Sequence, residues 1–270
     1  MSYILHGATC LHDGCYHHNA RIGSSGGIGK AIAINLASLG AKLVINYTSN
    51  KEQPELVAKD INSGCVDGIP RAVVVQADVS EPMHVKLLFD EAERVFGHRF
   101  MSSLIQLPLL IPSIIPSLTL LWRILICQLQ RNILMLQRDR KPGKTRRWGR
   151  IILLSSSLVG LLKPNIATYT EHQRQQLRQT KIFAKELKGT GITANCVAPG
   201  PTATDMFLTG TSEELIKRVI EECPWEACED VAPLVGFLAS DAKLYLPSQF
   251  YSFLQSENVV TSNKLLMDKC

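Results

Sequence analysis

The stretch GSSGGIG at residues 23–29 has the composition of a ligand-binding turn. Gly23, Gly27 and Gly29 allow the backbone to turn tightly and to approach a ligand closely. The next residues, KAIAINLASLGA, have apolar side chains at helical spacing, so the glycines stand at a predicted helix N-terminus. Because backbone N–H groups at such a terminus bind phosphate, the turn predicts a site for a dinucleotide pyrophosphate. A glycine-rich turn that binds nothing is the alternative.

A second cluster, CLHDGCYHH at residues 10–18, brings two cysteines and three histidines together. Thiolate and imidazole groups at this density can bind zinc. A folded zinc site normally has a second pair of ligands elsewhere, and the sequence offers none with clean spacing, so we expect no metal. The eight cysteines are scattered and the start of the chain has no secretory pattern, which favours reduced thiols in a cytoplasmic protein.

The segments around the glycine turn alternate between apolar strands and amphipathic helices. The predicted strands are KLVINY (42–47), RAVVVQADV (71–79), RIILLSSS (150–157) and ITANCVAPG (192–200), and helices are predicted near 52–62 and over 81–96. This alternation predicts an α/β fold with a doubly wound parallel sheet. The 270 residues, 46% hydrophobic and 20% charged, are enough for a substantial core.

Two stretches interrupt this pattern. Residues 101–136 are apolar, and 101–122 contain no charge, which permits a membrane span. Prolines at 108, 112 and 116 and Arg123 argue against such a span. The basic run RDRKPGKTRRWGR at 138–150 could contact nucleic acid, but no stacking aromatic residues are interleaved with it. We therefore expect neither a membrane nor a nucleic-acid partner.

Five motifs, in this order and spacing, resemble the classical short-chain dehydrogenase/reductase family: GSSGGIG, QADVS, RIILLSSSLVG, Tyr169 and NCVAPGPTATDMF. Within that family the chain looks most similar to plant NADPH-dependent aldehyde reductase-like proteins. The resemblance covers residues 23–97, 149–170 and 180–242, and it implies one Rossmann-like domain over residues 1–270. The first, fourth and last strands of the family are not recognisable, so the sequence predicts an incomplete sheet.

The resemblance assigns cofactor binding to loops that follow the strands. The matching residues are Gly23, Ser24, Ser25, Gly27, Ile28, Gly29, Asn46, Asp78, Val79, Pro199, Gly200 and Thr204. Asn46 stands where relatives that prefer NAD carry an acid, and a neutral side chain there favours NADPH by removing repulsion against a 2′-phosphate. Asp78 alone could be a helix cap, and the segment from Pro199 to Thr204 alone could be a plain turn.

The catalytic residues that the resemblance implies are Ser157, which positions a carbonyl, and Tyr169, which donates a proton. A phenol is a poor acid at neutral pH, and the family lowers its pKa with a lysine four residues later, on the same helix face. Here that position is Gln173, which carries no charge. It lies in EHQRQQLRQ (171–179), a polar stretch between segments suited to a core.

A shifted reading frame accounts for this polar stretch. Residues 171–178 can be encoded as GAG CAT CAA AGG CAG CAG TTG AGG, with CAA following for Gln179. From the third base this string encodes Ala-Ser-Lys-Ala-Ala-Val-Glu-Ala, which would place the family's lysine four residues after Tyr169. Shifted frames also permit family-like segments at 14–18 (first strand), 99–106 (fourth strand) and 119–125 (next helix).

We therefore expect the product of a reductase gene with compensating frameshifts, arising from gene decay or from an error in the recorded sequence. By descent it reduces a small-molecule carbonyl with NADPH, and as written it is impaired or inactive. If it folds like the family, a homo-oligomer is expected. A non-catalytic nucleotide-binding relic and a membrane-associated protein built on 101–136 are the alternatives.

Overall fold

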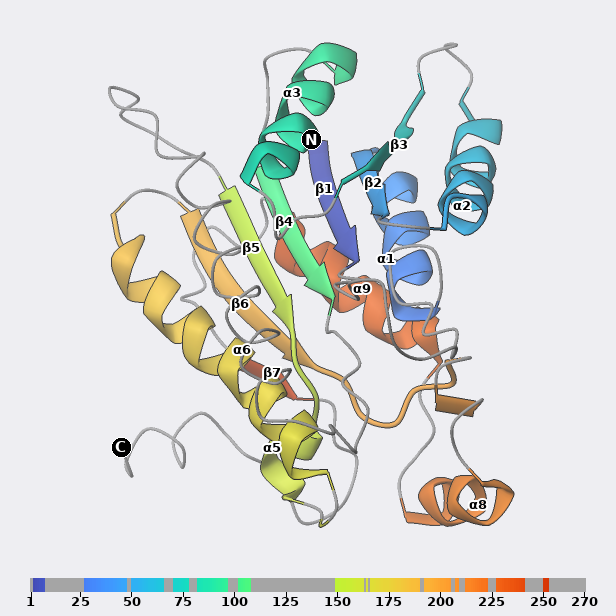
Figure 1. The fold of residues 1–270 in the computed structure, drawn as a ribbon, viewed down its shortest axis with the longest axis vertical. Helices are drawn as coiled ribbons and strands as arrows, with labels where there is room; N and C mark the ends of the chain where they lie inside the picture. The colour runs from blue at the N-terminus through green and yellow to red at the C-terminus, as the bar shows by residue number, and fades with distance from the viewer. Residues whose placement is uncertain are drawn as a thin grey trace.

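The computed structural model describes the chain in segments. They are residues 2–7, 27–47, 50–65, 70–77, 82–96, 102–107, 149–162, 164, 166–189, 192–204, 207–208, 212–222, 227–240 and 250–252. A seven-stranded sheet in the order β3-β2-β1-β4-β5-β6-β7 forms the centre (Figure 1). Its strands are β1 (Ser2–Gly7), β2 (Lys42–Tyr47), β3 (Ala72–Gln76), β4 (Ser102–Leu107), β5 (Gly149–Leu154), β6 (Ile192–Ala198) and β7 (Phe250–Ser252).

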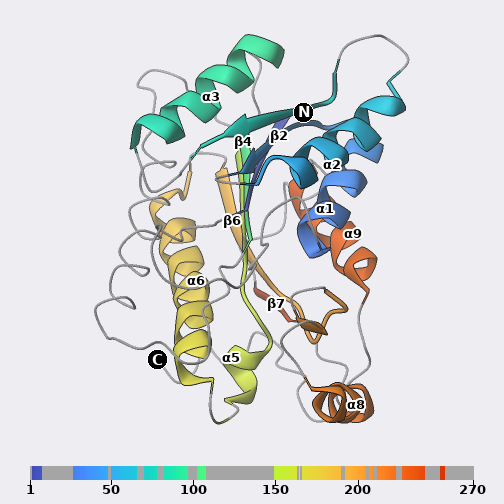
Figure 2. The ribbon, with the colours of Figure 1, turned by 45° about the vertical axis from the view of Figure 1, so that its right-hand side comes forward.

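Helices cover both faces of this sheet (Figure 2). On one face lie α1 (Gly27–Ser38), α2 (Glu52–Ser63) and α9 (Cys228–Ala239). On the other lie α3 (Pro82–Phe96) and α6 (Ala167–Glu186). Short α5 (Leu158–Leu161) follows β5, and α8 (Glu213–Glu222) stands apart from the sheet in both views.

Each adjacent pair of strands is parallel, and the strand order reverses between β1 and β4. In open α/β sheets, ligands bind at the carboxyl ends of the strands beside such a reversal. The predicted α/β class with a doubly wound parallel sheet is therefore confirmed.

The expectation of an incomplete sheet is wrong for the described residues. The first, fourth and last strands are present as β1, β4 and β7. β1 pairs with both β2 and β4, from Ser2 opposite Lys42 and Ser102. A short apolar stretch becomes a central strand when two neighbours satisfy its backbone, even where it lacks the family's residues.

Two of these strands can be compared with the segments that the shifted frames supply. β4 (Ser102–Leu107) overlaps residues 99–106, where the shifted frame places the family's fourth strand. β1 ends at Gly7, well before the glycine turn, and residues 14–18 lie outside the described part of the chain. The start of the apolar run 101–136 is thus a strand. No helix in the described residues is long and apolar enough to cross a membrane.

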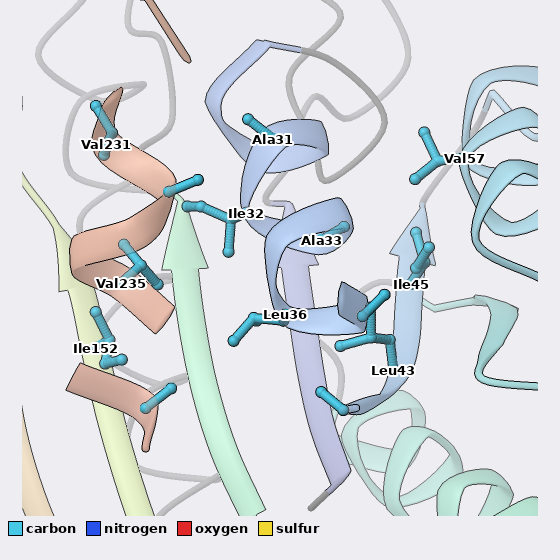
Figure 3. Packing of buried hydrophobic residues seen from close by; sticks show 14 of the residues in the cluster. Ala31, Ile32, Ala33, Leu36, Leu43, Ile45, Val57, Ile152, Val231 and Val235 are labelled. Atoms are coloured by element: carbon cyan, nitrogen blue, oxygen red, sulfur yellow. The ribbon is translucent and has the colours of Figure 1, made fainter. Parts of the chain in front are cut away.

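The larger apolar core lies between the sheet, α1 and α9 (Figure 3). Ile32 and Leu36 of α1 are completely buried, and they face Val231 and Val235 of α9 and the strands. Full burial of each such side chain stabilises the fold by about 1.5–3 kcal/mol. This core holds the first turn of α1 against the carboxyl edge of the sheet.

Candidate functional site

The described part of the glycine turn is its last segment, at the start of α1. Gly27 has a φ of +50°, a conformation that glycine adopts without strain. A Cβ atom at Gly27 would lie 2.9 Å from Thr204 Cγ2, so Gly27 and the loop after β6 are in close contact. Ile28 is half-buried and Gly29 is buried beside them. Gly23, Ser24 and Ser25 lie outside the described residues.

The loop after β6 also joins the end of β5. The backbone N–H of Ser155 donates to Val197 O (2.7 Å), and that of Ser157 donates to Pro199 O (3.0 Å). Thr202 Oγ1 donates to Gly200 O at 3.1 Å, which stabilises the turn. The structure therefore brings Gly27, Thr204 and Pro199 to one edge of the sheet, together with the serines after β5.

Asn46 occupies the end of β2, where it is 2% exposed. Its Nδ2 donates to the backbone carbonyl oxygens of Ala77 (2.8 Å) and Val75 (3.2 Å). The amide thus ties the end of β2 to β3, a structural role that depends on residues 29 and 31 positions further along the chain. Asp78 and Val79, the next residues along the chain, lie outside the described part.

Tyr169 is in the first turn of α6, half-buried against the end of β5. Burial raises the pKa of the Tyr169 phenol, and a side-chain hydrogen bond with Ser156 opposes that rise. The Gln173 amide also opposes the rise, although neither of its polar atoms has a well-aligned hydrogen bond. The hydroxyl that contacts the phenol is that of Ser156, while Ser157 begins α5 next to it.

Sequence reasoning missed Ser156 and Ser155. Three consecutive serines follow β5, and spacing alone does not show which of them faces the helix. Ser155 Oγ donates to the backbone carbonyl of Gln173 at 2.8 Å, which fixes α6 beside the strand end. The triplet is the only signal in the sequence, and the position of α6 beside the strand end determines which serine contacts which residue.

Gln173 fills the position where the resemblance implies a lysine. It is 0% exposed, one turn after Tyr169, and neither Nε2 nor Oε1 makes a well-aligned hydrogen bond, although the amide contacts the phenol. A buried polar atom without a partner costs about 1–3 kcal/mol. A neutral amide also provides no positive charge to lower the pKa of the phenol.

Polar residues line much of the face that α6 turns to the sheet. The buried ones are Thr170, His172, Gln173, Gln176, Gln179 and Thr180. Ile182, in contrast, is 52% exposed on the same helix. This arrangement reverses the usual preference for apolar residues toward a sheet.

Other candidate ligands fall mostly outside the described residues. The cluster at 10–18 and nearly all of the basic run 138–150 are among them, and Arg150 is buried within β5. Within the described segments, no group of three or more His, Cys, Asp or Glu residues could hold a metal ion.

Comparison with known proteins defines the class. The model described as short chain dehydrogenase matches residues 21–99, and that described as enoyl-(acyl carrier protein) reductase matches residues 124–250. The chain belongs to the short-chain dehydrogenase/reductase family of oxidoreductases, as the five motifs predicted.

Two curated relatives are similar to this chain over most of its length. The chain is 43% identical over 240 residues to NADPH-dependent aldehyde reductase 2, chloroplastic, of Arabidopsis thaliana, covering 84% of this chain and 88% of the relative. It is 42% identical over 236 residues to a short-chain type dehydrogenase/reductase of Picea abies, covering 84% and 87%.

Solved structures share the fold. A dehydrogenase/reductase from Sinorhizobium meliloti 1021 matches with a TM-score of 0.75 at 23% identity, covering 93% of this chain and 92% of that one. The promiscuous reductase LugOII matches with a TM-score of 0.74 at 24% identity, covering 93% and 94%.

Proposed function

We propose that this chain derives from an NADPH-dependent reductase of aldehydes or ketones and that, as written, its turnover is severely impaired. The observation that carries the proposal is Gln173, a neutral, fully buried amide one helical turn after Tyr169. With Gln173 at this position, Tyr169 is still present as the proton donor, but the positive charge that would lower the pKa of its phenol is absent.

The residues present fit a dinucleotide. Only a residue without a Cβ suits position 27, because of its positive φ and the nearby Thr204 methyl, and its backbone lies at the N-terminus of α1. Bound NADPH would supply a hydride to the carbonyl carbon. Gly27, Ile28, Gly29, Pro199, Gly200 and Thr204 would hold it, with Gly23, Ser24, Ser25, Asp78 and Val79 completing the set.

The protein's own contribution to the reaction is a proton. Tyr169 would donate it from the phenol oxygen to the carbonyl oxygen as the hydride arrives, and Ser156 or Ser157 would orient that carbonyl. Because burial raises the pKa of Tyr169 and no cation stands at position 173, the phenol gives up its proton reluctantly at neutral pH.

The preference for NADPH has two supports. Asn46 introduces no negative charge at the end of β2, so it does not repel a 2′-phosphate. Two of the relatives are named NADPH-dependent aldehyde reductase or reductase-like protein. Those names also support an aldehyde as the substrate class of the ancestral enzyme.

One buried position of α6 supports the frameshift hypothesis. The shifted frame puts valine at buried position 176, whereas at exposed positions 171, 174 and 178 it replaces charged residues by alanine. It puts lysine at position 173, beside the phenol. Position 177 is an exception, because Leu177 packs in the core and the shifted frame puts glutamate there.

Restoring the shifted segment tests the proposal. The substitutions are Glu171→Ala, His172→Ser, Gln173→Lys, Arg174→Ala, Gln175→Ala, Gln176→Val, Leu177→Glu and Arg178→Ala. We expect kcat/KM for NADPH oxidation with a simple aldehyde to rise at least about 100-fold over the unaltered chain, the range of general acid catalysis. A control with Gln173→Met among the same substitutions should stay inactive. An unaltered chain that turns over as fast as the restored one contradicts the proposal.

A non-catalytic nucleotide-binding protein is the second candidate, because Gly27 and Thr204 are in place while the lysine is absent. It predicts that NADPH raises the melting temperature of the unaltered chain without any turnover. A homo-oligomer and a cytoplasmic location stay predictions. The Arabidopsis relatives are named chloroplastic, so imaging of a fluorescent fusion is needed to locate the protein.

A further inference from the structure

Helix α6 consists of two parts that pack different kinds of side chain against the sheet. In the second part, Phe183 and Leu187 join Leu177 in an apolar cluster. Their partners are Ile151 and Leu153 of β5 and Ala194 and Cys196 of β6. Removing this part from the sheet would expose all of that apolar surface, so it is firmly held.

In the first part of α6, the large side chain of Tyr169 packs against the end of β5. Residues 170–176 read TEHQRQQ, without an apolar side chain. Thr170 Oγ1 and Oε1 of Gln175 are buried without hydrogen-bond partners. Both amide atoms of Gln173 are also buried without a well-aligned hydrogen bond, although the amide contacts the Tyr169 phenol. Water would satisfy all of these atoms if this part of the helix left the sheet.

We propose that residues 167–176 open away from the sheet by local unfolding, while residues 177–187 stay docked. Leu177, the first apolar residue inside α6 after Tyr169, is where the two parts meet. The hydrogen bond from Ser155 Oγ to Gln173 O and the contact of the Tyr169 phenol with Ser156 oppose the opening. Hydration of the four poorly satisfied buried polar atoms favours it. Local opening of this kind follows low apolar contact.

The opening has a consequence for the candidate site. Tyr169 lies on the part that opens, whereas Ser156 lies at the strand end that stays. Their contact therefore breaks each time the segment opens. This inference does not depend on the proposed function, since it requires neither a cofactor nor turnover.

Hydrogen exchange measured by mass spectrometry on the full chain tests the inference. We expect peptides within 167–176 to be protected about 100-fold less than peptides within 180–187 and within β6. Thr170→Val combined with Gln173→Leu removes three of these poorly satisfied buried polar atoms, and it should raise the protection of 167–176 at least about tenfold.

Thr180→Val is the matched control. It makes the same chemical change on the same helix, but Thr180 Oγ1 donates to Gln176 O at 2.8 Å. Its loss should leave protection of 167–176 unchanged or lower. Equal protection of the two parts of α6 would overturn the inference, and so would a chain in which β5 and β6 exchange as fast as residues 167–176.

Discussion

At the scale of single residues, two neutral side chains at buried positions carry the proposals about this chain. Asn46 and Gln173 are both amides with almost no exposed surface. Asn46 donates to carbonyl oxygens on β3, so its burial is compensated, while the Gln173 amide makes no well-aligned hydrogen bond. The same chemical group thus stabilises one strand end and destabilises one helix.

Asn46→Asp should destabilise the protein as well as disfavour NADPH. A carboxylate would face the carbonyl oxygens of Val75 and Ala77, and the free energy of unfolding should fall by about 2–3 kcal/mol. Urea unfolding at pH 7 measures this loss. Asn50→Asp is the control, because exposed Asn50 Oδ1 already accepts a hydrogen bond from Glu52 N–H and a carboxylate keeps that bond. Equal stability of the two variants would contradict the structural role of Asn46.

Cys196 should make the fold sensitive to alkaline pH. Burial raises the pKa of its thiol from 9.0 to about 12, with Thr180 opposing the rise. The thiol therefore contributes stability that is complete below pH 9, the pKa in the unfolded chain, and is lost as pH rises toward 12. Between pH 8 and 10.5 we expect a loss of about 2 kcal/mol from this group.

Cys196→Ala removes that contribution to the pH dependence. Urea unfolding at both pH values should show a smaller loss for the variant than for the unaltered chain. Identical losses would mean that the thiol ionises as readily in the folded protein as in the unfolded one.

At the scale of elements, the site depends on two helix N-termini meeting one loop. α1 begins at Gly27 against Thr204, and α9 begins at Cys228, whose Sγ lies 3.6 Å from Ala203 O. The loop after β6 is thereby held by both helices. A side chain added at this contact should disturb the loop and the turn together.

Gly27→Ala tests this contact. The new Cβ would meet Thr204 Cγ2, and the φ of +50° disfavours alanine, so we expect a loss of about 1–2 kcal/mol in unfolding free energy and weaker NADPH binding. Adding Thr204→Ser removes the methyl and should recover part of the loss. Gly64→Ala is the control, because its Cβ would meet nothing within 4 Å. A Gly27→Ala protein with unchanged stability and NADPH binding would exclude a close contact.

At the scale of the whole molecule, a family fold coexists with segments that suit it poorly. In the described part of the chain the sheet has seven strands and its main core is apolar and buried, yet α6 turns polar residues toward β5 and β6. The free energy of unfolding of a folded domain is only about 5–15 kcal/mol, and several unsatisfied buried polar groups lower it by a large fraction. We expect the unaltered chain to be poorly soluble.

The transcript should show the origin of these segments. We expect codons 171–178, taken from the third base of codon 171, to encode Ala-Ser-Lys-Ala-Ala-Val-Glu-Ala in independent clones. A clean slip that restores lysine four residues after Tyr169 would assign the reductase activity to the corrected protein. Codons that cannot encode the shifted segment would end the frameshift hypothesis.

The sequence by itself determined the features that depend on local spacing. The α/β class follows from the alternation of strands and helices, the proposed nucleotide-binding turn from its glycines, and the absence of a lysine from the position of Gln173 four residues after Tyr169. Helix periodicity and turn chemistry act over a few residues, so they can be recognised without a fold.

Only the tertiary structure decided what depends on distant partners. β1, β4 and β7 lack recognisable motifs, and they are strands because neighbours far along the chain satisfy their backbone groups. Two side-chain contacts likewise join segments that are distant in the sequence. They are the contact of Ser156 with Tyr169 and the hydrogen bonds from Asn46 to the end of β3. Burial of Gln173 is a property of the packed helix and sheet, because the same nine-residue segment in isolation would be fully hydrated.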